Sequence, residues 1–141
     1  MRTTIDREKV LLILEWCINK FGKSKFHNKL PVLRVYKTEG KSGYSDRLTG
    51  LCGTYCDGTI TIYLASNRSV RELCCTVIHE YKHYLMSEKE FRILHKKMTE
   101  RGCEYDDILR NHPHEKRAVR AENTWGDICF NELKSKLYKK D

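Results

Sequence analysis

The sequence lacks an apolar run long enough to cross a bilayer, and its start lacks the layout of a secretory signal peptide. The apolar run at residues 10–14 is short, is flanked by acidic residues and is followed by no small-residue cleavage site. The sequence also contains no internal repeat and no low-complexity tract. We therefore expect a cytoplasmic protein with no membrane partner, folded as a single domain over residues 1–141.

The cysteines do not form the pattern of a disulfide framework. The chain has seven of them, an odd number at irregular spacing, which does not fit a set of paired disulfides. Cys52 and Cys56 could ligate a metal, but no second cysteine pair accompanies them. We expect both to be small, partly buried side chains in a reducing compartment, and Cys74 and Cys75 to be helix-packing residues.

Acidic residues are nearly missing from one stretch of the chain. Between Lys20 and Lys41, seven basic residues are opposed by Glu39 alone, in a chain whose formal net charge is +8. A basic region of this kind can bind nucleic acid or an acidic protein, and it can equally form an ordinary solvated surface. Nucleic acid is therefore one partner that the sequence leaves open.

Hydrophobic periodicity predicts that the first half of the chain contains one helix and about three strands. Apolar residues recur at helical spacing over residues 6–21, with an aspartate to cap the start and a glycine just past the end. Strands are predicted at residues 31–36, 51–56 and 59–64, the last two joined by an Asp-Gly hairpin signal. The polar segment 37–50 contains three glycines and is expected to be a mobile loop.

The second half of the chain is predicted to be helical. Ser69 and Glu72 form an S-x-x-E capping box, so a helix is expected over about residues 70–86. Residues 87–101 are charged but compatible with a helix, and a proline in its first turn suits a last helix over 113–137. The fold class predicted is α+β, with an N-terminal helix, a small antiparallel or mixed sheet of about three strands, and C-terminal helices.

The most specific motif is His79-Glu80-Tyr81-Lys82-His83, which has the form H-E-x-x-H. On a helix, positions i and i+4 share a face, so the two imidazoles can reach one ion. Two neutral imidazoles suit zinc, and the Glu80 carboxylate can take a proton from an attacking water. The motif predicts zinc-assisted hydrolysis, with His79 and His83 as metal ligands and Glu80 as the general base.

The flanking sequence favours this interpretation over an exposed helix that carries these residues by chance. Mostly apolar residues precede the motif at 73–78 and follow it at 84–86, so the His-Glu pair is expected to be partly buried. A buried carboxylate is costly unless a metal or a partner compensates it. A catalytic zinc also needs a third protein ligand, for which Glu115 is the candidate and Glu122 the chief rival, with three histidines also open: His95, His112 and His114.

With these residues the chain resembles compact gluzincin-type zinc metallopeptidases, and most closely the ImmA/IrrE-type proteins and related small phage or mobile-element peptidases. The resemblance covers roughly Thr59 to Trp125 and includes the later segment Pro113-His114-Glu115-Lys116-Arg117-Ala118. In that family a Glu in an E-x-x-A context is the third zinc ligand, which implies Glu115 here. Members often carry an acidic residue where this chain has Val119, so support for a ligand histidine is expected from Glu122 or Asn123.

The resemblance implies a zinc-dependent endopeptidase that hydrolyses a peptide bond in a specific intracellular protein, such as a regulator in a phage or mobile element. Gluzincin-like proteins usually lay an extended substrate along an edge strand, and the strand predicted at 59–64 resembles it. Thr61 and Tyr63 of this strand are therefore expected to contact the substrate.

A second class of function is a nucleic-acid-associated protein that acts through the Lys20–Lys41 region. One version resembles the SprT-like, DNA-dependent peptidases, in which the third ligand would be a histidine, and His95 is the well-spaced candidate. Another version is a zinc-containing binding module without catalysis. Salt-sensitive binding to DNA or RNA would support this class, because phosphate contacts release counterions.

Overall fold

The computed structural model describes residues 5–38, 40–41, 49–56, 58–86, 89, 96 and 113–138. Its elements are three α-helices, one short 3-10 helix and five strands: α1 (Arg7–Phe21), β1 (Val32–Tyr36), β2 (Gly40–Lys41), β3 (Thr49–Leu51), β4 (Gly53–Cys56), β5 (Thr59–Tyr63), η1 (Leu64–Ser66), α2 (Val70–Tyr84) and α5 (Pro113–Leu137). The expected α+β class is confirmed, with the N-terminal helix, the small sheet and the C-terminal helix in the predicted order.

Helix α1 begins and ends where its capping residues predict. The Asp6 side chain accepts a hydrogen bond from the Lys9 amide at 3.0 Å, which satisfies one of the unpaired donors of the first turn. Gly22 follows the helix with a φ of 80°, and its amide donates to the Ile18 carbonyl at 2.9 Å. A residue with a side chain would be strained at this φ, so the glycine permits the turn into the following connector.

The main sheet has three strands in the order β1-β5-β4, with β1 parallel to β5 and β4 antiparallel to it. Ile60 and Ile62 on β5 are fully buried against the helices, as their alternation predicts. The expectation that this strand lies at an edge is wrong, because β5 is paired on both sides. The hairpin turn at Gly58 folds β4 against one side of β5, and β1 pairs with the other side.

The segment expected to be a mobile loop contains paired backbone. Strands β2 and β3 form a separate antiparallel ribbon, in which Gly40 lies opposite Leu51 and Lys41 lies opposite Thr49. The intervening residues, 42–48, lie outside the described residues, as does the helix expected over 87–101 apart from two isolated positions. Among the helices that the structure describes, none is long and apolar enough to cross a membrane.

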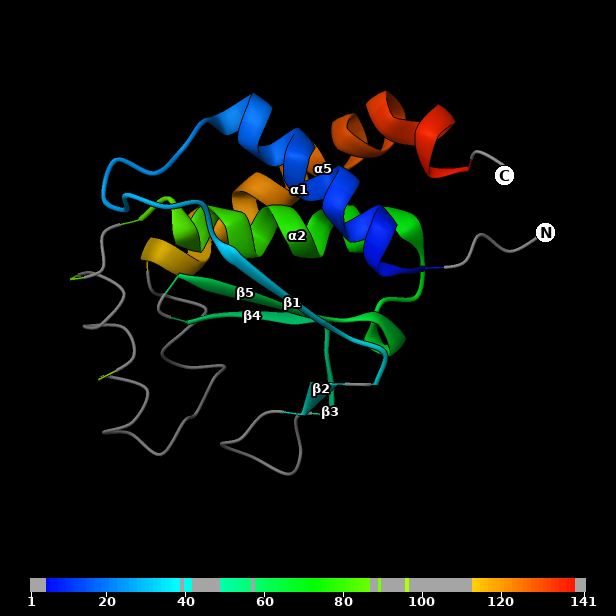
Figure 1. Cartoon of the computed structure of the whole chain (residues 1–141), viewed down its shortest axis with the longest axis horizontal. Coiled ribbons are helices and arrows are strands. Elements are labelled where there is room, and N and C mark those ends of the chain that lie inside the picture. Colours follow the sequence, from blue (N-terminus) through cyan, green and yellow to red (C-terminus); the bar gives the residue numbers. More distant parts are fainter. Residues whose placement is uncertain are drawn as a thin grey trace.

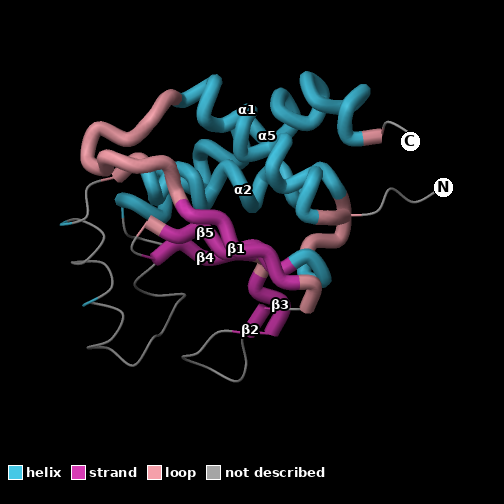
Figure 2. Tube along the Cα trace, in the orientation of Figure 1, coloured by secondary structure: helices cyan, strands magenta, loops and turns pink. Residues whose placement is uncertain are grey.

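Helix α2 is the centre of the molecule. It contacts β4 and β5 on one side and α1 and α5 on the other, so it lies between the sheet and these two helices (Figure 1). The helices gather on one side of the three-stranded sheet, and the β2–β3 ribbon extends from the other side (Figure 2). The fully buried side chains of α2 form the middle of the core, so the position of every residue on this helix is strongly determined.

Candidate metal centre

The start of α2 is fixed by its capping residues. The Ser69 hydroxyl accepts a hydrogen bond from the Glu72 amide at 3.1 Å, as the capping box predicts. The Glu72 carboxylate accepts from the Arg68 amide at 2.7 Å, one residue before the amide that a standard capping box uses. The helix then continues to Tyr84, so the H-E-x-x-H motif lies in its last two turns.

A buried asparagine that the sequence did not single out attaches α2 to the sheet. Asn67 is 4% exposed, and its amide nitrogen donates to the carbonyls of Tyr63 and Cys52. Its side-chain oxygen accepts from the Thr76 hydroxyl at 2.7 Å. Thr76 precedes His79 by three residues, so this network sets the position of the motif relative to β4 and β5.

Strand β4 approaches α2 very closely at the same level. A Cβ atom placed on Gly53 would lie 2.9 Å from the Thr76 methyl group and 3.1 Å from the Thr61 carbonyl. Only a glycine therefore fits this position without a shift of its neighbours. Because of this close contact, β4 packs directly against the helix that carries the motif.

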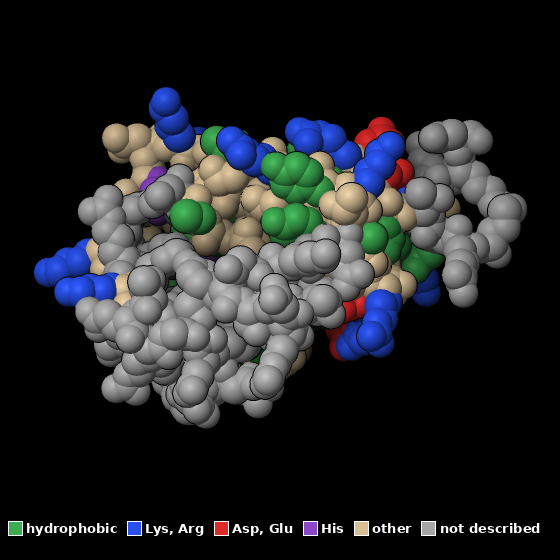
Figure 3. All heavy atoms as spheres, turned by 90° about the horizontal axis from the view of Figure 1, so that it is seen from below, with side chains coloured by type: hydrophobic (Ala, Val, Ile, Leu, Met, Phe, Trp, Pro, Cys, Tyr) green, Lys and Arg blue, Asp and Glu red, His purple; other side chains and the backbone are tan. Residues whose placement is uncertain are grey.

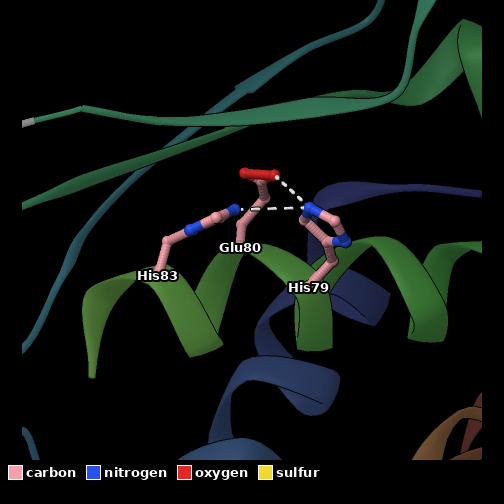
Figure 4. A group of neighbouring side chains, drawn as sticks. All are labelled: His79, Glu80 and His83. Atoms are coloured by element: carbon pink, nitrogen blue, oxygen red, sulfur yellow. Dashed lines mark hydrogen bonds and ion pairs between the residues drawn. The ribbon is translucent and has the colours of Figure 1, made fainter. Parts of the chain in front are cut away.

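His79, Glu80 and His83 point from α2 toward the strands, and their side chains converge (Figure 4). The two Nε2 atoms are 3.3 Å apart, and the nearer Glu80 oxygen is 3.9 Å from the His79 Nε2. One ligand atom from each of the three residues lies within 4.8 Å of the others, which makes this a group that could hold a metal ion. Two nitrogens bound to one tetrahedral zinc, each at about 2.0–2.1 Å, are about 3.3 Å apart, so the imidazole pair fits this ion.

The far nitrogen of His79 has a carboxylate partner on α5. The Nδ1 atom of His79 lies 3.2 Å from Glu122 Oε1. When the Nδ1–H group donates a hydrogen bond to this carboxylate, the ring stays neutral and the lone pair of Nε2 is directed at His83. Glu122 therefore lies where a residue that supports a ligand would lie, and not on the side of the ring where the two Nε2 atoms meet.

The expectation of a partly buried motif agrees with the structure. The side chains of His79 and Glu80 are 16% and 8% exposed, and His83 as a whole is 5% exposed. The charge of a carboxylate in such surroundings is poorly compensated by water, and a cation bound beside the two neutral imidazoles would compensate it. Two imidazoles with a carboxylate form a donor set that suits zinc.

The structure places the proposed third ligand only by its backbone. Glu115 lies in the first turn of α5, seven positions before Glu122, and residues seven apart on a helix share a face. The side chains of Glu115 and His114 lie outside the described residues, as do His95 and His112 altogether. Ala118, on the same stretch of α5, is fully buried.

The structure does not bring Thr61 and Tyr63 to the site. They alternate with Ile60 and Ile62 along β5, so their side chains lie on the face of the sheet away from α2. Tyr63 stacks there on Tyr36, with ring centroids 5.7 Å apart.

The cysteines take no part in the metal group. Within the described chain, His79, Glu80 and His83 form the one group of three potential ligands. Cys74 is fully buried in the core and Cys75 packs between α2 and α5, as predicted for helix-packing residues. Cys52 is partly buried, as expected, whereas Cys56 is exposed. Burial raises the pKa of Cys52 and raises that of Cys75 to about 11, which keeps both thiols protonated at neutral pH.

Two tyrosines inside and beside the motif attach it to another part of the chain. The Tyr81 hydroxyl donates to the Gly22 carbonyl, and the Tyr84 hydroxyl donates to the Lys29 carbonyl at 2.6 Å. Both rings are at most 1% exposed, and burial raises the pKa of Tyr81. Sequence patterns gave no sign of these contacts, because the partners are backbone carbonyls more than 50 positions away.

The arrangement has two chemical capacities. It can bind a cation between two imidazoles, and it can accept a proton on Glu80 beside that cation. Comparison of the chain with protein-family models, curated proteins and solved structures gives no match. Function is therefore inferred from the geometry and chemistry of this site.

Proposed function

We propose that the protein is a zinc-dependent peptidase in which His79, His83 and Glu115 hold the metal. The observation that supports this most strongly is the convergence of the two Nε2 atoms at 3.3 Å, with a carboxylate oxygen 3.9 Å from one of them. The separation of the nitrogens suits ligation of one ion, and the carboxylate is the group that separates a hydrolytic site from a simple metal-binding pair.

Each residue has a distinct task in this proposal. When bound, zinc would supply Lewis-acid polarisation of a peptide carbonyl and would make an adjacent water more acidic. Glu80 accepts the proton of the attacking water and can return it to the leaving amine. Glu122 keeps His79 in one orientation and one tautomer, and the low exposure of His83 and Glu80 limits the access of bulk water.

An extended substrate would use β4 rather than β5. Strand β4 is an edge of the three-stranded sheet among the described strands, and Gly53 draws it close to α2. A peptide added to a sheet edge gains main-chain hydrogen bonds with little demand on its sequence, and side-chain contacts then set specificity. The substrate class proposed is therefore a protein segment that can adopt an extended conformation.

Peptide cleavage by wild type and by Glu80→Gln tests this proposal. Both zinc-loaded proteins are incubated with a peptide library derived from denatured proteins, and new termini are identified by mass spectrometry. We expect cleavage by wild type and a loss of about 10²–10⁴-fold in Glu80→Gln, because the glutamine cannot accept the proton.

The zinc content of each sample is the control. Glu80→Gln is expected to retain zinc, whereas His83→Ala is expected to lose both zinc and cleavage. Equal cleavage by wild type and Glu80→Gln would show that a contaminating protease or another residue is responsible. No cleavage by zinc-loaded wild type would contradict the proposed activity.

A further inference from the structure

The connector between α1 and β1, residues 22–31, lies in the most basic part of the chain. Residues 16–38 contain no acidic residue, and all six of their basic side chains are exposed: Lys20, Lys23, Lys25, Lys29, Arg34 and Lys37. They supply six positive charges to a chain whose formal net charge is +8. Within the part of the chain that the structure describes, none of the six forms an ion pair. The Lys20 ammonium lies over the rings of Trp16 and Trp125, and the charge of the other five is available to an anionic partner.

The connector is held in place by the helix that carries the metal centre. Tyr81 and Tyr84 bind the carbonyls of Gly22 and Lys29, one near each end of the connector. The His27 ring stacks on Tyr84 with centroids 5.0 Å apart and an interplanar angle of 19°. These contacts hold the backbone of the connector against α2, and its lysine side chains are exposed. Because the connector is already ordered, a partner that binds it pays little conformational entropy.

An exposed aromatic ring lies among these lysines. Phe26 is 59% exposed, the highest value among the exposed large hydrophobic residues of the described chain. Its amide donates to the Ser24 hydroxyl at 3.1 Å, and Ser24 itself is buried, so a local turn fixes the backbone beside the ring. Phe26 follows Lys25 directly, and Lys23 and Lys29 each lie three positions from it, so its ring offers a flat apolar face within a basic segment.

We propose that this connector binds single-stranded nucleic acid, with Lys23, Lys25 and Lys29 on phosphates and Phe26 stacked on a base. Single strands present phosphates and accessible base faces together, whereas a duplex keeps the base faces inside its stack. An acidic polypeptide matches the charge, but the side chains that carry its charge give the ring no flat aromatic partner, whereas every nucleotide of a single strand has both groups. The charge and the exposed ring together therefore favour the single strand.

The bound strand would lie beside the metal centre. Tyr84 follows His83 directly, so the connector covers the C-terminal end of α2 (Figure 1). Described Lys and Arg side chains also lie at several places along the margin of the face seen in Figure 3. None of the four proposed contact residues belongs to the metal centre, so this binding is independent of the proposed peptidase activity.

Binding of a fluorescent 20-nucleotide single-stranded DNA, followed by anisotropy over a series of salt concentrations, tests the proposal. The triple variant Lys23→Gln/Lys25→Gln/Lys29→Gln should weaken binding and reduce the salt slope by about 2, because each phosphate contact on a single strand contributes about 0.7. Phe26→Ala should weaken binding at least about fivefold with the slope unchanged, because it removes stacking and no charge. Glu80→Gln should bind as wild type does.

A second triple variant, Arg120→Gln/Lys134→Gln/Lys136→Gln, removes the same charge from exposed positions on α5. An equal loss in both triple variants would overturn the proposal, because net charge alone would then explain binding. Tighter binding of a duplex than of the single strand would also overturn it, as would equal competition by polyglutamate of matched charge. Thermal unfolding of each variant verifies that the exposed substitutions leave the fold intact.

Discussion

At the scale of single residues, the contact between His79 and Glu122 is the most informative one. The sequence left Glu122 with two interpretations, as a rival metal ligand and as a support for a ligand histidine. Its carboxylate lies 3.2 Å from Nδ1 of His79, whereas the Nε2 of the same ring faces His83. A carboxylate on the far nitrogen orients the ring and increases its basicity toward a metal.

Substitution of Glu122 is therefore expected to reduce zinc affinity only in part. Glu122→Ala is expected to weaken zinc affinity about 10- to 100-fold without abolishing binding, because the two Nε2 atoms remain. Competition with a chromophoric chelator measures the affinity, and Thr124→Ala, at an exposed position on α5, is the matched control. A loss as complete as that of His79→Ala would instead identify Glu122 as a ligand, and unchanged affinity would remove it from the site.

The buried hydroxyl of Tyr81 predicts a pH effect at the same scale. Burial raises the pKa of Tyr81 above its ordinary value, so the folded state retains the phenol proton more strongly than the unfolded state. This contribution to stability is fully present below the unfolded pKa of about 10 and is lost as pH rises through the folded value. Tyr81→Phe should cost about 1 kcal/mol at neutral pH, since it removes one hydrogen bond.

The difference in the free energy of unfolding between wild type and Tyr81→Phe should decrease above about pH 10. Urea unfolding at a series of pH values measures this difference. The buried thiols also titrate at alkaline pH, but both proteins contain them, so their effect cancels in the difference. A difference that stays constant from neutral to alkaline pH would contradict the assignment to the Tyr81 phenol.

At the scale of elements, the contact between α2 and α5 depends on one glycine. A Cβ atom on Gly126 would lie 2.4 Å from the Cys75 sulfur and 3.8 Å from the Cys75 Cβ. The sulfur therefore occupies the space that a larger residue at 126 would need. This close approach brings Glu122, one turn earlier on α5, to His79.

A double-mutant cycle tests this contact. Gly126→Ala is expected to destabilise the protein by about 1–3 kcal/mol, because the overlap outweighs the gain in helix propensity. In the Cys75→Ala background the same substitution should stabilise by up to about 1 kcal/mol, because the obstructing sulfur is gone and alanine favours the helix. Urea unfolding of the four proteins gives the coupling energy, and additive effects would contradict the close packing.

The elements differ in how well the sequence predicts them. Capping residues correctly predicted the ends of helices where the cap is local in sequence, as at Asp6, Gly22 and Ser69. The proline at position 113 correctly predicted the start of α5. The place of β5 in the sheet was not predictable, because the alternation of Ile60 and Ile62 is the same in an edge strand and a central strand. The parallel partner β1 is more than 20 positions away, and such pairing leaves no local signal.

At the scale of the whole molecule, the candidate site joins elements that the sequence separates widely. The motif itself was predictable, because both histidines and Glu80 lie on one helix and helical spacing sets their geometry. The support from Glu122 depends on how α5 packs across α2, and the anchoring by Tyr81 and Tyr84 depends on backbone carbonyls of the connector. These contacts follow from tertiary packing, which spacing along the chain does not determine.

Zinc binding should therefore stabilise the whole fold. A ligand that binds only the folded state at 100 times its dissociation constant adds about 2.7 kcal/mol, which corresponds to a rise of about 10 °C in Tm for a domain of this size. Thermal unfolding with added zinc, and again after a chelator, measures the effect. His83→Ala should show no such rise, and an equal rise in this variant would place the stabilising ion elsewhere.

The claim that His79 and His83 hold zinc beside Glu80 can be tested by measuring zinc content and affinity in identically purified wild type, His79→Ala and Glu80→Gln. We expect wild type to contain about one zinc per chain, Glu80→Gln to retain it, and His79→Ala to bind zinc much more weakly. Wild type that binds no zinc, or His79→Ala that binds it as tightly as wild type, would contradict the claim.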